Sequence, residues 1–241
     1  CLASNALSRH TPRLATARCA ELEITALRSS FSAAVADGLA KIAGNLDKGV
    51  ARGKVTAEDK AAAVARLSGA VDLERAIEGV QVVVEAVPER MDLKRDLFGR
   101  LGAALGPEVL LATNTSSLSI TEIADATEHP ERLVGMHFFN PVHIMKLVEV
   151  VRTERTSEEA ARTAIALAVR MGKDPIDVRD APGFASSRLG IAIGMEAIRM
   201  VEEQVASAED IDKAMVLGYG FPMGPLKLTD LVGLDVRLAI A

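Results

Sequence analysis

Short apolar runs recur along the middle of the chain, and most of them end at Pro, Asn or charged residues. The runs are Val80–Val87, Val109–Thr113, Leu133–Phe139, Leu147–Val151 and Pro175–Val178. Continuous apolar runs of this length are typical of strands that are buried on both faces of a parallel sheet. We therefore predict an α/β fold in which these runs form the sheet.

Helical spacing of apolar residues fills the intervals between the runs. From Phe31 to Arg66 the pattern is helical, with a break at Gly53. Thr56 and Asp59 have the spacing of a cap for a second helix through Leu67, so we predict an antiparallel pair. Two capping-box patterns, Ser119 with Glu122 and Thr156 with Glu159, predict further helix starts, and Met91–Leu105 is also helical.

After the last apolar run the pattern changes to helices only. Ala181-Pro182-Gly183-Phe184 is a plausible junction, and helices are predicted over Arg188–Gln204, Ser207–Leu217 and Leu226–Leu231. We predict three parts: an anomalous N-terminal segment over 1–30, a sheet domain over 31–180, and an all-helical domain over 181–241.

Composition excludes several classes of function. The 28 basic and 33 acidic residues give a net charge of −5, which offers no electrostatic case for nucleic acid, and no apolar run is long enough to span a membrane. Cys1 and Cys19 support neither a disulfide framework nor a zinc site. We expect no metal, because there is no Cys and His cluster and no H-E-x-x-H pattern. A serine hydrolase is unsupported because no G-x-S-x-G pattern occurs.

Three polar groups stand at or near the ends of consecutive apolar runs: the Ser116 hydroxyl, the His137 imidazole and the Glu149 carboxylate. Open α/β sheets place their chemistry at strand ends. Oxidising a secondary alcohol requires a hydride acceptor and a base for the hydroxyl proton, and histidine suits that proton transfer near neutral pH. Taken alone, a histidine at the end of an apolar strand, such as His137, is more often structural, and a turn serine such as Ser116 is usually only a turn former. Taken alone, Glu149 is equally compatible with a water-facing position on an edge strand.

Several motifs in order resemble the 3-hydroxyacyl-CoA dehydrogenases, in particular bacterial 3-hydroxybutyryl-CoA dehydrogenases. They are NTSSLSITEIA from Asn114, GMHFFNPVHIMKLVEV from Gly135, APGF from Ala181 and YGFPMGPLKLTDLVGLD from Tyr219. The resemblance implies a Rossmann-like sheet domain followed by an all-helical dimerisation and substrate domain. It also implies oxidation of an (S)-3-hydroxyacyl-CoA to the 3-oxoacyl-CoA in fatty acid β-oxidation, NAD as cofactor with NADP as an alternative, and a homodimer. The expected location is cytoplasmic, with the mitochondrial matrix as an alternative.

The same resemblance implies roles for individual residues. His137 would be the base, Glu149 would hold one imidazole nitrogen, and Ser116 would bind the substrate oxygen close to the nicotinamide. Cofactor-binding positions on the nicotinamide side would be Glu89, Lys94, Asn114, Ser116 and Asn140. Judged without the family, Glu89 and Lys94 are ordinary helix-surface charges and Asn140 is a turn residue. The helical pair from Phe31 would contact coenzyme A, with Lys48 or Lys54 near its phosphates or simply solvated.

Departures from the family pattern support a rival reading. The family begins with a G-x-G-x-x-G turn that receives the pyrophosphate, whereas the first glycine here is Gly38, and Ser29 or Ser30 stands where an acid would bind the ribose. Ser187 replaces the usual asparagine in APGFASSR. The rival is a catalytically impaired acyl-CoA-binding or dimerising remnant. The start also resembles an organellar presequence or an artefact, and the carboxyl end looks cut.

Overall fold

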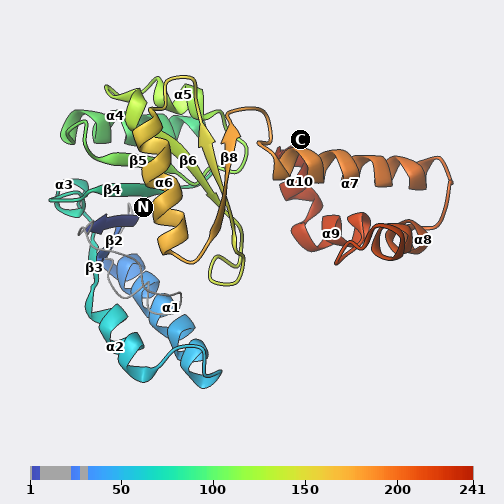
Figure 1. Ribbon diagram of the computed structural model, residues 1–241, viewed down its shortest axis with the longest axis horizontal. Coiled ribbons are helices and arrows are strands. Elements are labelled where there is room, and N and C mark those ends of the chain that lie inside the picture. Colours follow the sequence, from blue (N-terminus) through green and yellow to red (C-terminus); the bar gives the residue numbers. More distant parts are fainter. Residues whose placement is uncertain (1, 6–22, 28–31, 241) are drawn as a thin grey trace. The chain divides into compact units, whose positions relative to one another are not determined.

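The computed structural model describes residues 2–5, 23–27 and 32–240, and these contain one eight-stranded sheet (Figure 1). The strand order is β3-β2-β1-β4-β5-β6-β7-β8. The bounds are β1 Leu2–Asn5, β2 Glu23–Leu27, β3 Leu67–Ala70, β4 Val82–Glu85, β5 Leu110–Thr113, β6 Leu133–Phe138, β7 Leu147–Arg152 and β8 Asp174–Arg179. Each of the five predicted apolar runs therefore contains or overlaps a strand.

The sheet is mixed in direction. Strands β4, β5 and β6 run parallel, as do β7 and β8 and also β2 and β3, whereas β6 pairs with β7 in antiparallel register. Strand β1 is antiparallel to both of its neighbours, β2 and β4. The expectation of a parallel sheet thus holds for the central strands, where the apolar runs are longest, and is wrong at β1 and at the β6–β7 hairpin.

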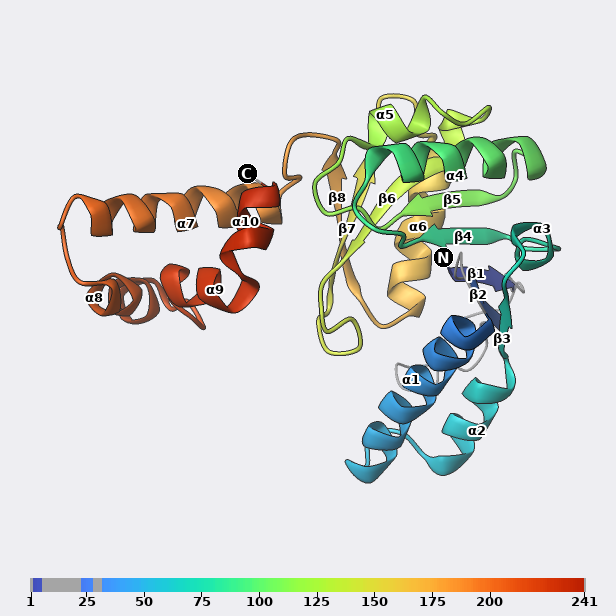
Figure 2. The same ribbon diagram turned by 180° about the vertical axis from the view of Figure 1, so that it is seen from behind.

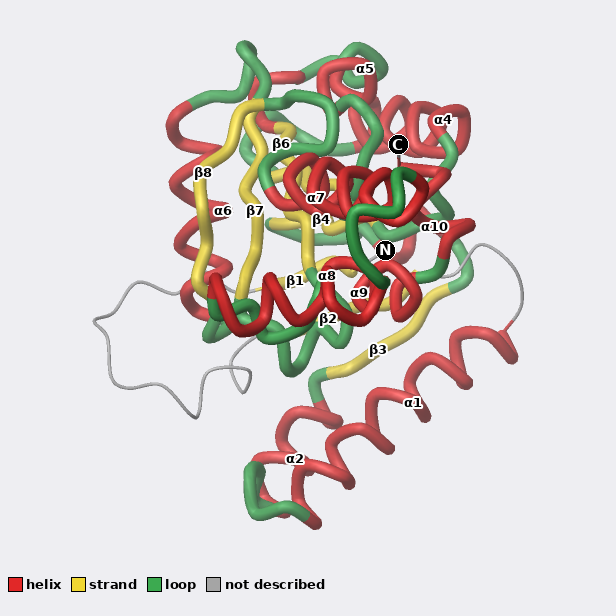
Figure 3. The backbone as a smooth tube through the Cα atoms, turned by 90° about the vertical axis from the view of Figure 1, so that its right-hand side faces the viewer, coloured by secondary structure: helices red, strands yellow, loops and turns green. Residues whose placement is uncertain are grey.

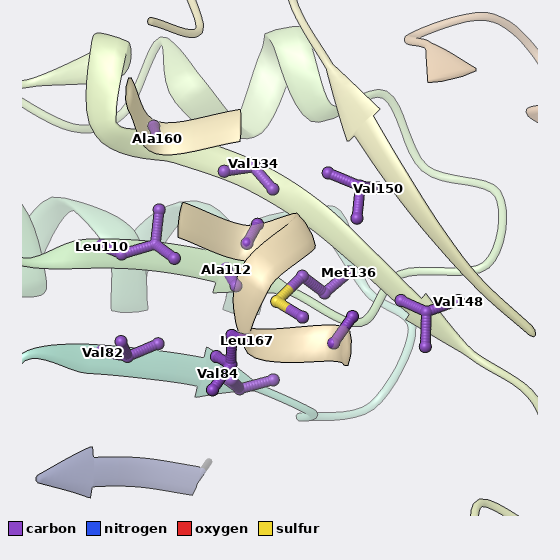
Figure 4. Packing of buried hydrophobic residues seen from close by; sticks show 12 residues of the cluster. Val82, Val84, Leu110, Ala112, Val134, Met136, Val148, Val150, Ala160 and Leu167 are labelled. Atoms are coloured by element: carbon purple, nitrogen blue, oxygen red, sulfur yellow. The ribbon is translucent and has the colours of Figure 1, made fainter. Parts of the chain in front are cut away.

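Helices cover both faces of the central strands. Helix α6, Glu158–Arg170, lies on one face, and α4, Met91–Ala104, with the short α5, Ile120–Ala124, lies on the other (Figures 1 and 2). On the α6 side a buried cluster joins the even-numbered residues of β4 to β7 with the apolar stripe of α6 (Figure 4). Because successive strand residues point to opposite faces, odd-numbered residues of these strands face α4 and α5.

The start of α6 differs from the predicted capping box. Ser157 is the N-cap and its hydroxyl accepts a hydrogen bond from the Ala160 backbone N–H. The neighbouring Thr156 instead donates to the Leu133 carbonyl oxygen at 2.9 Å. The pairing of Thr156 with Glu159 was therefore wrong by one residue, because the Thr156 hydroxyl is used to join the helix entrance to β6.

The predicted antiparallel helix pair is present as α1, Ser32–Ala51, and α2, Ala57–Ala65 (Figure 3). Thr56 caps α2 by accepting from the Asp59 backbone N–H, as predicted. The prediction extended α2 through Leu67, but Leu67 begins β3, which pairs with β2. A Cβ added to Gly69 of β3 would lie 2.1 Å from Cγ1 of Val35, so the glycine permits α1 to pack directly on this strand. Short α3, Leu73–Ala76, follows β3.

Residues outside the described part include 6–22 and 28–31, and therefore Ser29 and Ser30. The predicted N-terminal segment over 1–30 is thus described only at β1 and β2, both of which belong to the sheet.

The chain divides into two compact units. The first comprises residues 1–115 and 120–180, and the second comprises Ser116–Ser119 with 181–241. In the second unit α7, Ser186–Glu202, packs against α9, Pro225–Val232, and both contact α8, Ala208–Lys213. A π-helical turn, η3 Ala214–Gly218, follows α8, and α10, Leu234–Ile240, completes the unit. No helix among the described residues has the length and apolar content of a membrane span.

Candidate active site

His137 and Glu149 face each other across the β6–β7 hairpin. They are register partners in the antiparallel pair, and His137 Nδ1 lies 2.7 Å from Glu149 Oε2. The relative exposure is 5% for His137 and 0% for Glu149. Because β7 lies between β6 and β8, Glu149 is not on an edge strand, so the water-facing alternative for this carboxylate is wrong. With Nδ1 donating to the carboxylate, Nε2 is the imidazole nitrogen that carries the lone pair.

The backbone around His137 is held by tight packing and by one side-chain bond. A Cβ added to Gly135 would lie 2.3 Å from Cδ1 of Ile120 and 2.9 Å from Cβ of Val151, so glycine allows α5 to lie against β6. Asn114, directly after β5, accepts a hydrogen bond from the Phe138 backbone N–H through Oδ1 at 2.9 Å. The ring of Phe139 lies 4.5 Å from the His137 ring, centroid to centroid. The imidazole is therefore fixed on β6 by both of its neighbouring strands.

A second polar cluster surrounds Lys94 of α4. Lys94 Nζ lies 2.9 and 3.1 Å from the two carboxylate oxygens of Glu85 and 3.3 Å from Glu89 Oε2. Thr113 donates to Glu85 at 2.6 Å, and Thr115 donates to Glu89 at 2.6 Å. The side chain of Lys94 is 1% exposed and that of Glu89 is 38% exposed. The alternative that Lys94 is an ordinary helix-surface charge is therefore wrong.

The two polar groups occupy the same face and the same edge of the sheet. Glu85, Thr113, His137 and Glu149 are all odd-numbered strand residues, opposite the α6 cluster. Glu85 pairs with Thr113, and Thr113 pairs with Gly135, two residues before His137. Glu85, Thr113 and His137 are at or near the carboxyl ends of β4, β5 and β6, where open α/β sheets bind their ligands, and Glu149 is opposite His137 on antiparallel β7. The Lys94 cluster and the His137–Glu149 pair can therefore both contact a ligand bound at these strand ends.

The remaining predicted residues are distributed over both units. Asn140 is exposed in the turn after β6, in the first unit. Ser116 is half-buried in the Ser116–Ser119 segment, which belongs to the second unit. Ser187, at the position of the usual asparagine, lies in the first turn of α7, also in the second unit. The structure thus brings together His137 with Glu149, and Lys94 with Glu89, while the roles of all the predicted site residues stay predictions.

Glu85, Thr113 and Thr115 were not predicted as site residues. A signal for Glu85 was present, because it is the one acid inside the apolar run VQVVVEAV. A carboxylate in a strand that is buried on both faces requires a partner, since an unpaired buried charge is very costly. The partner, Lys94, is the fourth residue of the following helix.

Two family models cover most of the chain. The NAD-binding domain of 3-hydroxyacyl-CoA dehydrogenase matches residues 15–181, and the C-terminal domain of 3-hydroxyacyl-CoA dehydrogenase matches residues 183–241. The chain belongs to the 3-hydroxyacyl-CoA dehydrogenase family. Within this family the chain is an enzyme, an oxidoreductase, and NAD is its cofactor, as predicted. The predicted fold class, a Rossmann-like sheet domain followed by a helical domain, is likewise confirmed.

Individual members of the family are similar over most of the chain. A probable 3-hydroxybutyryl-CoA dehydrogenase of Bacillus subtilis is 46% identical over 84% of this chain and 70% of its own length. The 3-hydroxybutyryl-CoA dehydrogenase of Clostridioides difficile is 44% identical over 89% of this chain and 76% of its own. The crystal structure of (S)-3-hydroxybutyryl-CoA dehydrogenase from Ralstonia eutropha superposes with a TM-score of 0.87 at 40% identity, covering 92% of this chain and 78% of that chain.

The described residues of this family member fit the nicotinamide half of NAD. Glu89 offers an accessible carboxylate that can accept from ribose hydroxyls, and the Asn114 amide nitrogen is a donor that its bond to Phe138 does not use. For the pyrophosphate half, no glycine precedes Gly38, and residues 6–22 lie outside the described part. Among the described residues, no group of three or more His, Cys, Asp or Glu could hold a metal ion.

Proposed function

We propose that this protein interconverts (S)-3-hydroxyacyl-CoA and 3-oxoacyl-CoA, with a short acyl chain such as 3-hydroxybutyryl. The observation that carries the proposal is the buried contact of 2.7 Å between His137 Nδ1 and Glu149 Oε2 at the carboxyl edge of the sheet. A buried imidazole with one nitrogen committed to a carboxylate is arranged for proton transfer at the other nitrogen. The similar enzymes of Bacillus subtilis and Clostridioides difficile support the substrate class.

In the oxidation direction, His137 Nε2 takes the proton of the C3 hydroxyl group as the carbon–oxygen double bond forms. NAD, when bound, supplies the acceptor for the hydride that leaves C3. Glu149 keeps Nδ1 protonated and stabilises the positive charge that the ring gains when Nε2 is protonated. In reduction the same imidazolium returns its proton to the oxygen. The oxidation is thus balanced: the substrate loses one proton to His137 and one hydride to NAD.

The other predicted residues bind and orient. The Ser116 hydroxyl hydrogen-bonds the reacting oxygen of the substrate. Glu89, Lys94, Asn114 and Asn140 hold the nicotinamide and its ribose. Of the two exposed lysines at the end of α1 and in the following turn, Lys48 or Lys54 meets the phosphates of coenzyme A, which opposite charge favours.

The experiment is an assay of the purified chain with NADH and acetoacetyl-CoA, together with binding of each ligand measured separately. The proposal predicts loss of NADH absorbance that depends on acetoacetyl-CoA, and quenching or transfer of NADH fluorescence on binding. The alternative is an acyl-CoA-binding or dimerising protein without dehydrogenase activity. It predicts that acyl-CoA still binds while NADH neither binds nor is consumed, and this outcome would replace the proposal.

We further propose that the protein forms a homodimer through its helical unit. Large apolar side chains are exposed on η3, α9 and α10, including Leu217 at 81%, Leu231 at 70% and Leu238 at 81%. Apolar side chains grouped on helices in this way are typical of interfaces between subunits. A second copy of the same chain is the partner that the family resemblance implies.

A further inference from the structure

The carboxylate of Glu85 is completely enclosed and fully used. It is 0% exposed, and it receives hydrogen bonds from Lys94 Nζ on both oxygens, from the Thr113 hydroxyl and from the Val87 backbone N–H. A carboxylate whose acceptor sites are occupied in this way has no role as a direct ligand contact. Its effect on any ligand must therefore be transmitted through Lys94.

Lys94 connects this enclosed carboxylate to an accessible one. The ammonium group lies 3.3 Å from Glu89 Oε2, and Glu89 is the member of the cluster whose side chain is 38% exposed. Thr115 holds the other oxygen of Glu89 at 2.6 Å. The order from interior to surface is therefore Glu85, Lys94, Glu89. Thr113, on β5, donates to Glu85, and Thr115, after β5, donates to Glu89.

Stability alone does not explain a pair of this kind. Removing two charges from water carries a large desolvation cost, and apolar residues of similar size often stabilise a fold as well or better. This ion pair lies at the carboxyl ends of the central strands, on the same face of the sheet as His137. A buried pair in this place is suited to fixing the orientation of the Lys94 ammonium group.

We propose that Glu85 is a positioning residue for cofactor binding, which holds the Lys94 ammonium group and, through it, orients the Glu89 carboxylate toward the nicotinamide ribose. This inference rests on the proposed function, in which Lys94 and Glu89 contact the cofactor. Glu85 itself touches neither the cofactor nor the substrate. It determines how strongly the chain binds NADH, and it leaves acyl-CoA binding unchanged.

The test is a double-mutant cycle on the dissociation constant for NADH, measured by fluorescence titration of the full chain. Glu85→Gln keeps the shape of the side chain and removes its charge, and we expect NADH binding to weaken about tenfold. In the background of Lys94→Met the same Glu85→Gln change is expected to alter NADH binding by less than about twofold, because the residue through which it acts is absent.

Two further variants separate positioning from folding. Asp92→Asn is the matched control, because it removes one negative charge from the first turn of α4, where Asp92 pairs with exposed Arg90. Its expected effect on NADH binding is less than about twofold, since exposed pairs contribute little. If Glu85→Gln does not fold, Thr113→Val removes one donor to Glu85 without changing charge, and the expected weakening is about threefold.

Glu85→Gln itself decides between a structural and a positioning role. A structural role predicts that its melting temperature falls while the NADH affinity of the folded protein equals that of wild type. The positioning role predicts a folded protein whose NADH affinity is lower than that of wild type. Equal NADH binding by wild type and Glu85→Gln, or additive effects in the cycle, overturns the inference alone. Absence of NADH binding by the wild type overturns the proposed function and the inference with it.

Discussion

At the scale of single residues, the His137–Glu149 contact is a cross-strand pair on the interior strands β6 and β7. Both side chains are buried, and the distance of 2.7 Å is that of a strong hydrogen bond. Because an ionised carboxylate can only accept hydrogen bonds, Glu149 selects the imidazole tautomer that protonates Nδ1. The orientation of the His137 imidazole therefore depends on the Glu149 carboxylate.

Glu149→Gln tests this dependence. The amide can turn its NH₂ group toward Nδ1 and stabilise the wrong tautomer, so we expect kcat to fall about 100-fold or more, with NADH binding unchanged. Steady-state kinetics with acetoacetyl-CoA and a fluorescence titration measure the two quantities. Glu154→Gln, an exposed carboxylate in the turn after β7, is the control and should retain wild-type kcat. A kcat for Glu149→Gln within about threefold of wild type would refute the steering role.

Ser187→Asn tests the departure from the family pattern. An asparagine side chain is longer than serine and adds an amide donor for the reacting oxygen, so we expect kcat to rise about tenfold. The neighbouring change Ser186→Asn, in the same first turn of α7, controls for adding an amide to this helix end. If Ser187→Asn shows no gain in kcat over wild type, this position does not limit turnover.

Prediction of single residues from the sequence succeeded where a motif was present. It failed where the environment of a side chain depended on burial by distant parts of the chain. His137 and Glu149 were predicted as a pair, and the structure places them in contact. Lys94, judged from the residues alone, was a helix-surface charge, yet it is 1% exposed. Helical periodicity shows which residues share a face of α4, but it does not show that the buried carboxylate of Glu85 on β4 lies against that face.

At the scale of elements, α4 approaches the turn after α5 so closely that a glycine is required. A Cβ on Gly102 would lie 2.5 Å from Thr127 Oγ1 and 3.0 Å from the Glu128 backbone nitrogen, whereas nothing lies within 4 Å of a Cβ on Gly44 in α1. We therefore expect opposite signs for the same substitution. Gly102→Ala should lower the free energy of unfolding by about 1–3 kcal/mol through steric overlap.

Gly44→Ala is the matched change, and it should raise the free energy of unfolding by up to about 1 kcal/mol, because alanine restricts the unfolded chain and favours helix. Urea unfolding monitored by circular dichroism measures both variants. Equal destabilisation by the two substitutions would contradict the packing of α4 that holds Lys94 over the sheet.

Elements that carry a strong local pattern were predicted well from sequence. The apolar runs gave β4 to β8, and the break at Gly53 separated α1 from α2. Strand β3 was missed because Leu67–Ala70 is short and its identity as a strand depends on pairing with β2, far away in sequence. The cap of α6 was misplaced because Thr156 and Ser157 are adjacent hydroxyl residues, and only the contact with Leu133 distinguishes them.

At the scale of the whole molecule, the helical unit exposes apolar side chains that a second copy is proposed to cover. Changing Leu231 and Leu238 to lysine places charges on this surface, so we expect the dimer to dissociate. Light scattering after size-exclusion chromatography should give twice the chain mass of 25.5 kDa for wild type and a single chain mass for the variant. Val64→Lys, on exposed α2, is the control, and a monomeric wild type would contradict the homodimer.

Division into a sheet part and a helical part was accessible from the sequence, because the pattern changes from apolar runs to helical spacing near Ala181. The antiparallel direction of β1 and the membership of β2 in the sheet were not predicted from residues 1–30, which contain no glycine turn. Strand direction depends on tertiary pairing, which short segments do not encode locally.

The most direct measurement of the central claim compares wild type and His137→Gln in turnover of acetoacetyl-CoA with NADH, with both ligands' dissociation constants measured on the same preparations. If His137 transfers the proton, kcat falls by about two orders of magnitude or more while the binding of NADH and acetoacetyl-CoA stays within about twofold of wild type. Retention of wild-type kcat by His137→Gln would contradict the account.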